Sequence, residues 1–161
     1  MNGIPRARRA SKPVRVSLAT DRNGVIDGAW WPHSSAIAAE LPDLIGALHP
    51  ALGEVETMQI NWSPTEGQLD LETIAAGSRM ALPGGHHRRP RLMSIVGREA
   101  SVKLLVVPSM TSQALGSMVL RASAGLTPVI DATNNRIYET ACLVVGLART
   151  ESMKWREAAN S

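Results

Sequence analysis

The sequence predicts an α+β domain with a mainly antiparallel β-sheet and two helices packed on one face. Short segments in which apolar and polar residues alternate come in pairs that are separated by turn residues, as in β-hairpins. Two longer segments carry apolar residues at helical spacing. The order hairpin, helix, strands, helix is typical of folds that keep sheet and helices in separate layers.

The first hairpin is expected between residues 14–18 and 25–31, with a turn at residues 21–24 that contains an Asn-Gly pair. Its second strand carries Trp30 and Trp31, two of the four tryptophans in a chain with no phenylalanine and one tyrosine. Neighbours on a strand point to opposite faces, so we expect one indole in the core. The other either packs beneath the next helix or anchors a ligand or partner on the outer face.

The first helix is expected over residues 34–48, where apolar residues recur at helical spacing. Pro42 lies inside this pattern, and a break into two helical turns at this point is the alternative. Residues 54–62 alternate as a strand that carries Met58, Ile60 and Trp62 on its inner face. Residues 69–74 are interpreted as a shorter strand that pairs with it.

The second half of the chain contains another predicted hairpin, between residues 91–96 and 101–107. The latter strand is nearly all apolar and should be central in the sheet. Thr111 is expected to cap a second helix, which Gly125 ends.

Three segments have weaker patterns. Residues 75–90 are rich in glycine and proline and are interpreted as a loop, with a short strand near residues 79–82. Residues 137–147 fit either a strand or a helix, and their β-branched content favours a strand. Residues 150–161 are interpreted as a frayed polar tail, from which Trp155 could dock back on the domain.

The sequence is divided into a basic arm at residues 1–13, one domain at residues 14–125, and a C-terminal extension and tail at residues 126–161. The formal charge is +3, but five of the 17 lysines and arginines lie in residues 1–15, which hold no acid. The arm is therefore either a solvated tail or a weak, non-specific contact to nucleic acid through residues 1–15.

The single cysteine, Cys142, excludes an intrachain disulfide. It lies in an apolar run, which favours a buried structural thiol over a nucleophile. The first residues show no secretory signal, and no apolar run approaches the ~20 residues of a membrane span. We therefore expect a cytoplasmic protein with no membrane contact.

Two candidate sites emerge from the sequence. The loop at residues 84–91 combines two glycines with five basic or imidazole side chains and no acid, so it is expected either to bind an anion or to be a solvated loop. No metal is expected there, because adjacent histidines on a strand point apart. The five side chains are His86, His87, Arg88, Arg89 and Arg91.

The other candidate site surrounds the tryptophan pair. Asp27 and His33 flank Trp30 and Trp31 and could act as an acid–base couple of a small enzyme. Alternatively, Asp27 makes a turn and His33 merely precedes a helix cap. The favoured hypothesis is a non-enzymatic binding or regulatory module with no cofactor, and the sequence identifies neither ligand, partner nor oligomeric state.

Several pieces of the sequence resemble an actinobacterial, mycobacterial-type family of small uncharacterised proteins with a D-G-A-W-W-P signature, found here at residues 27–32. The resemblance covers roughly residues 14–124 and leaves residues 125–161 outside. It implies a cytoplasmic protein and brings no activity, cofactor or catalytic residue. The similar pieces are residues 16–18, 24–34, 39–44, 61–62 and 103–108.

Overall fold

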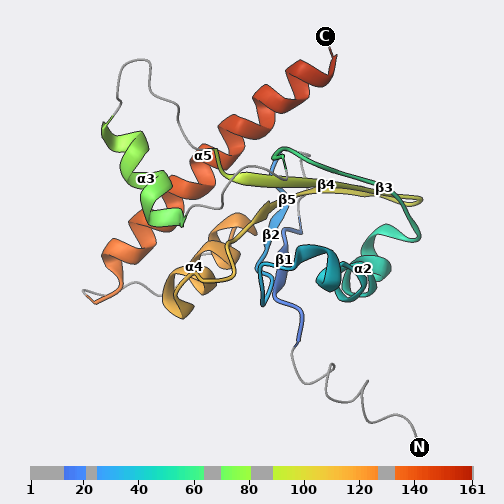
Figure 1. Cartoon of the computed structure of the whole chain (residues 1–161), viewed down its shortest axis with the longest axis horizontal. Helices are drawn as coiled ribbons and strands as arrows, with labels where there is room; N and C mark the ends of the chain where they lie inside the picture. The colour runs from blue at the N-terminus through green and yellow to red at the C-terminus, as the bar shows by residue number, and fades with distance from the viewer. Residues whose placement is uncertain (1–12, 21–24, 64–69, 81–88, 127–132, 161) are drawn as a thin grey trace, which may run out of the picture.

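The computed structural model describes residues 13–20, 25–63, 70–80, 89–126 and 133–160. Within these ranges the chain forms a five-stranded sheet with helices on both faces (Figure 1). The elements are, in order, β1 (Val16–Leu18), β2 (Gly28–Trp30), α2 (Ile37–Leu52), β3 (Val55–Ile60), α3 (Leu71–Met80), β4 (Arg91–Gly97), β5 (Ser101–Val106), α4 (Gln113–Ser123) and α5 (Asn135–Asn160).

The sheet has the order β1-β2-β5-β4-β3 and is mixed. Both predicted hairpins are present, since β1 pairs antiparallel with β2 and β4 pairs antiparallel with β5. β3 also pairs antiparallel with β4, whereas β2 and β5 are parallel. The α+β class is thus confirmed, but the sheet is not purely antiparallel. The parallel pair arises because α2, β3, α3 and β4 intervene between its two strands.

The helices lie on both faces of the sheet, and not on one as expected. α2 covers one face with Leu44, Leu48 and Leu52, which follow each other at helical spacing and are fully buried. α3, α4 and α5 cover the other face (Figure 1). The physical reason is β5, whose consecutive Leu104 and Leu105 are both fully buried and point to opposite faces. Both faces therefore need an apolar cover.

The tryptophan pair divides between these two cores. Trp30 packs with the α2 side and Trp31 with the opposite side, and each is only 2% exposed. The expectation of one buried indole therefore extends to both, and neither lies on the outer surface as an anchor. Together they tie the first hairpin to both helical layers.

The predicted first helix continues without a break through Pro42 and Pro50. Proline inside a helix costs about 3 kcal/mol. Burying three leucine side chains on the sheet contributes roughly 1.5–3 kcal/mol each and offsets that cost. The helix therefore continues although Pro42 by itself predicts a break.

The strand predicted at residues 69–74, and the loop and short strand after it, are replaced by α3 as far as residue 80. Asp70 starts the helix, because its carboxylate oxygen Oδ1 accepts a hydrogen bond from the Thr73 amide at 2.7 Å. This backbone hydrogen bond also holds the pKa of Asp70 below its usual value. Leu71, Ile74 and Ala75 then reach the core at helical spacing.

The strand favoured at residues 137–147 is also wrong, because these residues belong to α5. The same helix continues to residue 160 in place of a frayed tail, and Trp155 packs against the core as expected. Ala141, Val144, Val145 and Ala148 are buried at helical spacing. Cys142 lies between them in sequence but faces outward, so the expected buried thiol is exposed. No helix of the described chain is long and apolar enough to cross a membrane.

The second predicted helix is α4, with its cap shifted by one residue. The Ser112 hydroxyl, and not that of Thr111, accepts a hydrogen bond from the Leu115 amide. Gly125 follows the helix with a φ of 78°, a conformation that favours glycine and ends the helix as expected.

Candidate functional site

A groove of about 590 Å³ lies between α2 and the β3–β4 end of the sheet. Its walls are mainly apolar, with two serines and one arginine among the lining residues. This size falls within the range of roughly 300–1,000 Å³ that is typical of ligand pockets. The lining residues are Ser35, Ile37, Ala38, Leu41, Met58, Ile60, Trp62, Ser63, Arg91 and Met93.

The alternation of β3 builds the floor of the groove. Met58 and Ile60 lie opposite Ile95 and Met93 of β4, which belong to the core beneath α2. The expected inner face of β3 is therefore correct, but the strand lies at the edge of the sheet. As a result Ile60 is 42% exposed and lines the groove.

Arg91 gives one end of this groove a positive charge. Its guanidinium carbon lies 4.9 Å from the centre of the Trp62 ring, within the range of a cation–π contact. Arg91 starts β4, and Trp62 follows β3, so the strand pair itself brings the two together. Arg91 was expected to belong to an anion site in the 84–91 loop. In the structure it contacts Trp62, and both residues line the groove.

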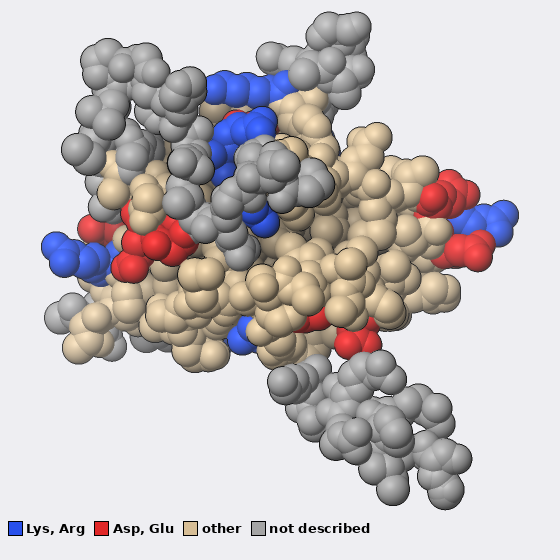
Figure 2. Space-filling model, in the orientation of Figure 1, with Lys and Arg blue, Asp and Glu red and all other residues tan. Residues whose placement is uncertain are grey.

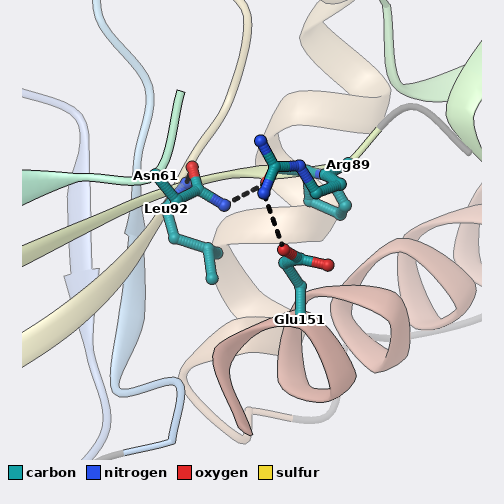
Figure 3. A network of polar contacts seen from close by, with 5 residues as sticks. Asn61, Arg89, Leu92 and Glu151 are labelled. Carbon is teal, nitrogen blue, oxygen red and sulfur yellow. Dashed lines mark hydrogen bonds and ion pairs between the residues drawn. The ribbon is translucent and has the colours of Figure 1, made fainter. Parts of the chain in front are cut away.

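A polar network fixes this end of the β3–β4 pair (Figure 3). The Asn61 side chain accepts a hydrogen bond from the Leu92 amide at 2.8 Å and donates one to the Pro90 carbonyl at 3.1 Å. Arg89, also expected in the anion loop, forms an ion pair with Glu151 of α5 at 3.4 Å. The segment that carries Arg91 is thus held from both sides.

The outer edge of β3 offers backbone hydrogen-bonding groups. The Asn61 amide donates to the Leu92 carbonyl, so odd-numbered residues of β3 direct their backbone toward β4 in this register. Met58 and Ile60 then direct their N–H and C=O groups away from β4. Among the strands of the described chain, β3 is the last in the sheet and pairs on one side only.

Asp27 and His33 are not brought together by the fold. The Asp27 carboxylate is fully buried ahead of β2 and accepts a hydrogen bond from the Lys103 amide of β5 at 2.9 Å. His33 is exposed beyond the other end of β2, where its Nε2 lies 2.8 Å from the Pro13 carbonyl oxygen. The three residues of β2 lie between them and span on the order of 10 Å. This separation does not support an acid–base couple.

Trp31 contributes to the fold through Arg15. The Arg15 guanidinium lies 3.6 Å from the ring centre and donates hydrogen bonds to the carbonyls of Trp31 and Pro32. Burial lowers the pKa of Arg15, and the charge of Glu40 opposes that shift. The last base of the expected nucleic-acid contact at residues 1–15 is therefore engaged by the hairpin, while residues 1–12 lie outside the described chain.

His86, His87 and Arg88 also lie outside the described residues, so the anion-binding hypothesis for the 84–91 loop stays a prediction. Across the described ranges, no group of three or more histidine, cysteine or acidic side chains is arranged to hold a metal ion.

A family model described as "Family of unknown function (DUF5994)" matches residues 15–123, which is well over half of the chain. The chain belongs to this family. The matched part of this DUF5994 protein runs from β1 to the end of α4 and includes every residue of the groove. Neither the curated proteins nor the solved structures contain a match. The actinobacterial origin and the D-G-A-W-W-P signature stay predictions.

Trp62 and Arg91 were predicted at two different places, on the inner face of a strand and in the anion loop, and the groove was not predicted. The alternation of residues 54–62 was a usable signal for one wall. Nothing local in the sequence of this DUF5994 chain indicates that β3 is an edge strand or that α2 stops short of covering it.

Proposed function

We propose that this protein is a non-enzymatic binding module that captures an extended peptide segment along β3. An open strand edge beside a groove is the arrangement by which peptide-binding domains add a strand to a sheet. In that mode backbone hydrogen bonds supply affinity, and pockets for alternate side chains supply specificity. The observation that carries this proposal is the position of the groove directly between β3 and α2.

The chemistry of the groove supports a particular kind of peptide. Alternate side chains of an added strand would point to the face that carries Ile37, Leu41 and Ile60, which favours apolar residues at these positions. Arg91 favours an acidic residue at its end of the groove, because guanidinium groups bind carboxylates through paired N–H donors.

The opposite end of β3 carries Glu54 and Glu56. These acids favour a basic residue on the peptide. An antiparallel peptide would therefore begin with acids beside Arg91 and end with bases beside the glutamates.

The test is an NMR titration of the ¹⁵N-labelled protein with a nine-residue peptide. The probe has two amino-terminal aspartates, five alternating valines and threonines, and two carboxy-terminal lysines. We expect the amides of Met58 and Ile60 and the indole of Trp62 to shift, since the added strand contacts them directly. The matched control is the same peptide with its charged ends exchanged, which should bind more weakly.

Two variants sharpen this test. Ile60→Lys places a charge in the groove and should abolish the shifts. Val96→Lys makes the same change at a similarly exposed position, 38% against 42%, on β4 and should leave binding intact. Equal binding by a peptide with proline at its central positions, which cannot donate backbone hydrogen bonds, would refute strand addition.

The cytoplasmic location expected from the sequence is part of this proposal. A peptide partner in that compartment is consistent with a chain whose single cysteine is unpaired.

A further inference from the structure

We infer that β3 of a second copy of this chain is one segment that docks on this edge, so that two five-stranded sheets join around a two-fold axis. The inference rests on the strand-addition function proposed above and names a partner for that same site. It is drawn from the backbone register, the exposed apolar side chains and the charges of β3 itself.

The backbone of β3 is self-complementary. Met58 and Ile60 are the residues whose N–H and C=O groups point outward. In an antiparallel pair with Gln59 opposite the partner's Gln59, Met58 lies opposite the partner's Ile60, and Ile60 opposite the partner's Met58. Each pair can then exchange both of its backbone hydrogen bonds.

The side chains on the groove face are complementary in the same register. Ile60 is 42% exposed, and Met58 and Trp62 are half-buried. Cross-strand apolar pairs are the stabilising unit of antiparallel sheets. A two-fold axis perpendicular to the sheet also leaves α2 on the same face in both copies, so that the two grooves adjoin across the axis.

The charges of β3 favour this antiparallel arrangement. Glu54 and Glu56 lie at its start, with side chains 74% and 55% exposed, and Arg91 lies at its far end. In the register above, the start of one β3, where Glu56 lies at an irregularity between Val55 and Thr57, lies near the end of the other strand, beside the partner's Trp62 and the partner's Arg91. A parallel pairing would instead place Glu56 beside the same residue of the partner.

The start of β3 carries exposed charges of both signs. Figure 2 shows acidic and basic side chains gathered at the tip of the β3–β4 end, with mostly uncharged surface beside it. At the start of β3, Arg98 contacts Glu54 at 3.5 Å and Glu56 at 4.0 Å. Because all three side chains are exposed, these ion pairs are weak and leave Glu56 able to exchange partners.

Sedimentation equilibrium of the full chain tests the inference. We expect a monomer–dimer equilibrium over a range of about 1–500 μM, since one strand pair makes a small interface. Ile60→Lys should remain monomeric, because a lysine on an edge strand blocks pairing. Val96→Lys, the matched control, should dimerise like the parent, and circular dichroism should show that both variants fold.

Charge reversal tests the register. Arg91→Glu and Glu56→Arg should each weaken dimerisation by on the order of tenfold or more, because like charges then face each other. The double variant Glu56→Arg/Arg91→Glu should recover most of this loss, since the pairs are restored with opposite sign. This rescue is specific to a self-complementary interface.

The outcomes separate the two proposals. A chain that stays monomeric throughout, while the acid-first peptide still shifts Met58 and Ile60, overturns self-pairing and leaves the peptide-binding function standing. A dimer that persists in Ile60→Lys, or a double variant that dimerises no better than the single ones, also overturns the inference. The inference is supported if Ile60→Lys abolishes dimerisation and if the double variant Glu56→Arg/Arg91→Glu dimerises better than either single charge reversal.

Discussion

At the scale of single residues, the fold depends on the close packing of Trp31. Its ring packs against both the Arg15 guanidinium and α4. The α4 contact requires Gly116, because a Cβ built there would lie 2.5 Å from the ring. Sequence analysis identified the importance of the indole, but neither of its two partners.

The first stability prediction concerns this glycine. Gly116→Ala should destabilise the protein by about 1–3 kcal/mol, the usual cost of overpacking a tight core. The matched control is Gly146→Ala in α5, where nothing lies within 4 Å of the added Cβ. There alanine should stabilise the helix by about 0.5–1 kcal/mol. Urea denaturation measures both, and an unchanged Gly116→Ala midpoint would mean that the ring is not held against α4.

At the scale of elements, the start of α2 is held by Glu40. Its carboxylate accepts hydrogen bonds from the His33 amide at 2.7 Å and from the Ser34 hydroxyl. Burial opposes ionisation of Glu40, but these hydrogen bonds outweigh it and keep its pKa below the usual value. Glu40 therefore helps to hold the loop that joins β2 to α2, and with it the Ser35–Ile37 side of the groove.

This arrangement predicts a pH dependence. Because the pKa of Glu40 is lower in the folded protein than in the unfolded chain, ionised Glu40 contributes stability above the unfolded pKa of about 4.3. That contribution is lost as the pH falls through the lower, folded value. The stability difference between the parent and Glu40→Gln should therefore be present at pH 7 and shrink below about pH 4. Thermal melts across this range measure it, and a difference that does not vary with pH would contradict the role of the charge.

Elements differ in how far their own sequence determined them. Both hairpins and α4 were predicted because alternation, turn residues and caps are local signals. α3 and α5 were not, since β-branched residues such as Ile74, Val144 and Val145 favour strands locally. Burial at helical spacing against the sheet outweighs that local preference.

At the scale of the whole molecule, α5 completes the core on the face opposite α2. Ala141, Val144 and Ala148 are fully buried there, and Ser152 donates a hydrogen bond to the Val25 carbonyl next to β2. The division at residue 125 is a prediction of the sequence analysis. The contacts of α5 lead us to expect that residues 14–125 do not fold by themselves.

Truncation tests this boundary. A chain that ends at residue 126 should lose cooperative unfolding in differential scanning calorimetry, because the truncation exposes the core that α5 covers and a typical domain is stable by only ~5–15 kcal/mol. A control that ends after Trp155 keeps Ala141, Val144, Ala148 and Ser152 and should melt as one unit. A cooperative transition in the shorter chain would establish residues 126–161 as a separate extension.

The sequence by itself determined the α+β class, the two hairpins, the central apolar strand, the helices at α2 and α4, and the importance of the tryptophan pair. These follow from periodicities and turn residues that lie within a few positions of each other. Tertiary structure alone decided the parallel β2–β5 pair, the helices on both faces, the helical state of α3 and α5, and the edge position of β3. Each of these features depends on which distant segment packs against a given strand or helix. That choice is made by the burial of apolar side chains, which local sequence patterns do not contain. The groove belongs to this second group, since it forms where α2 crosses the sheet next to β3, the last strand of the sheet in the described chain.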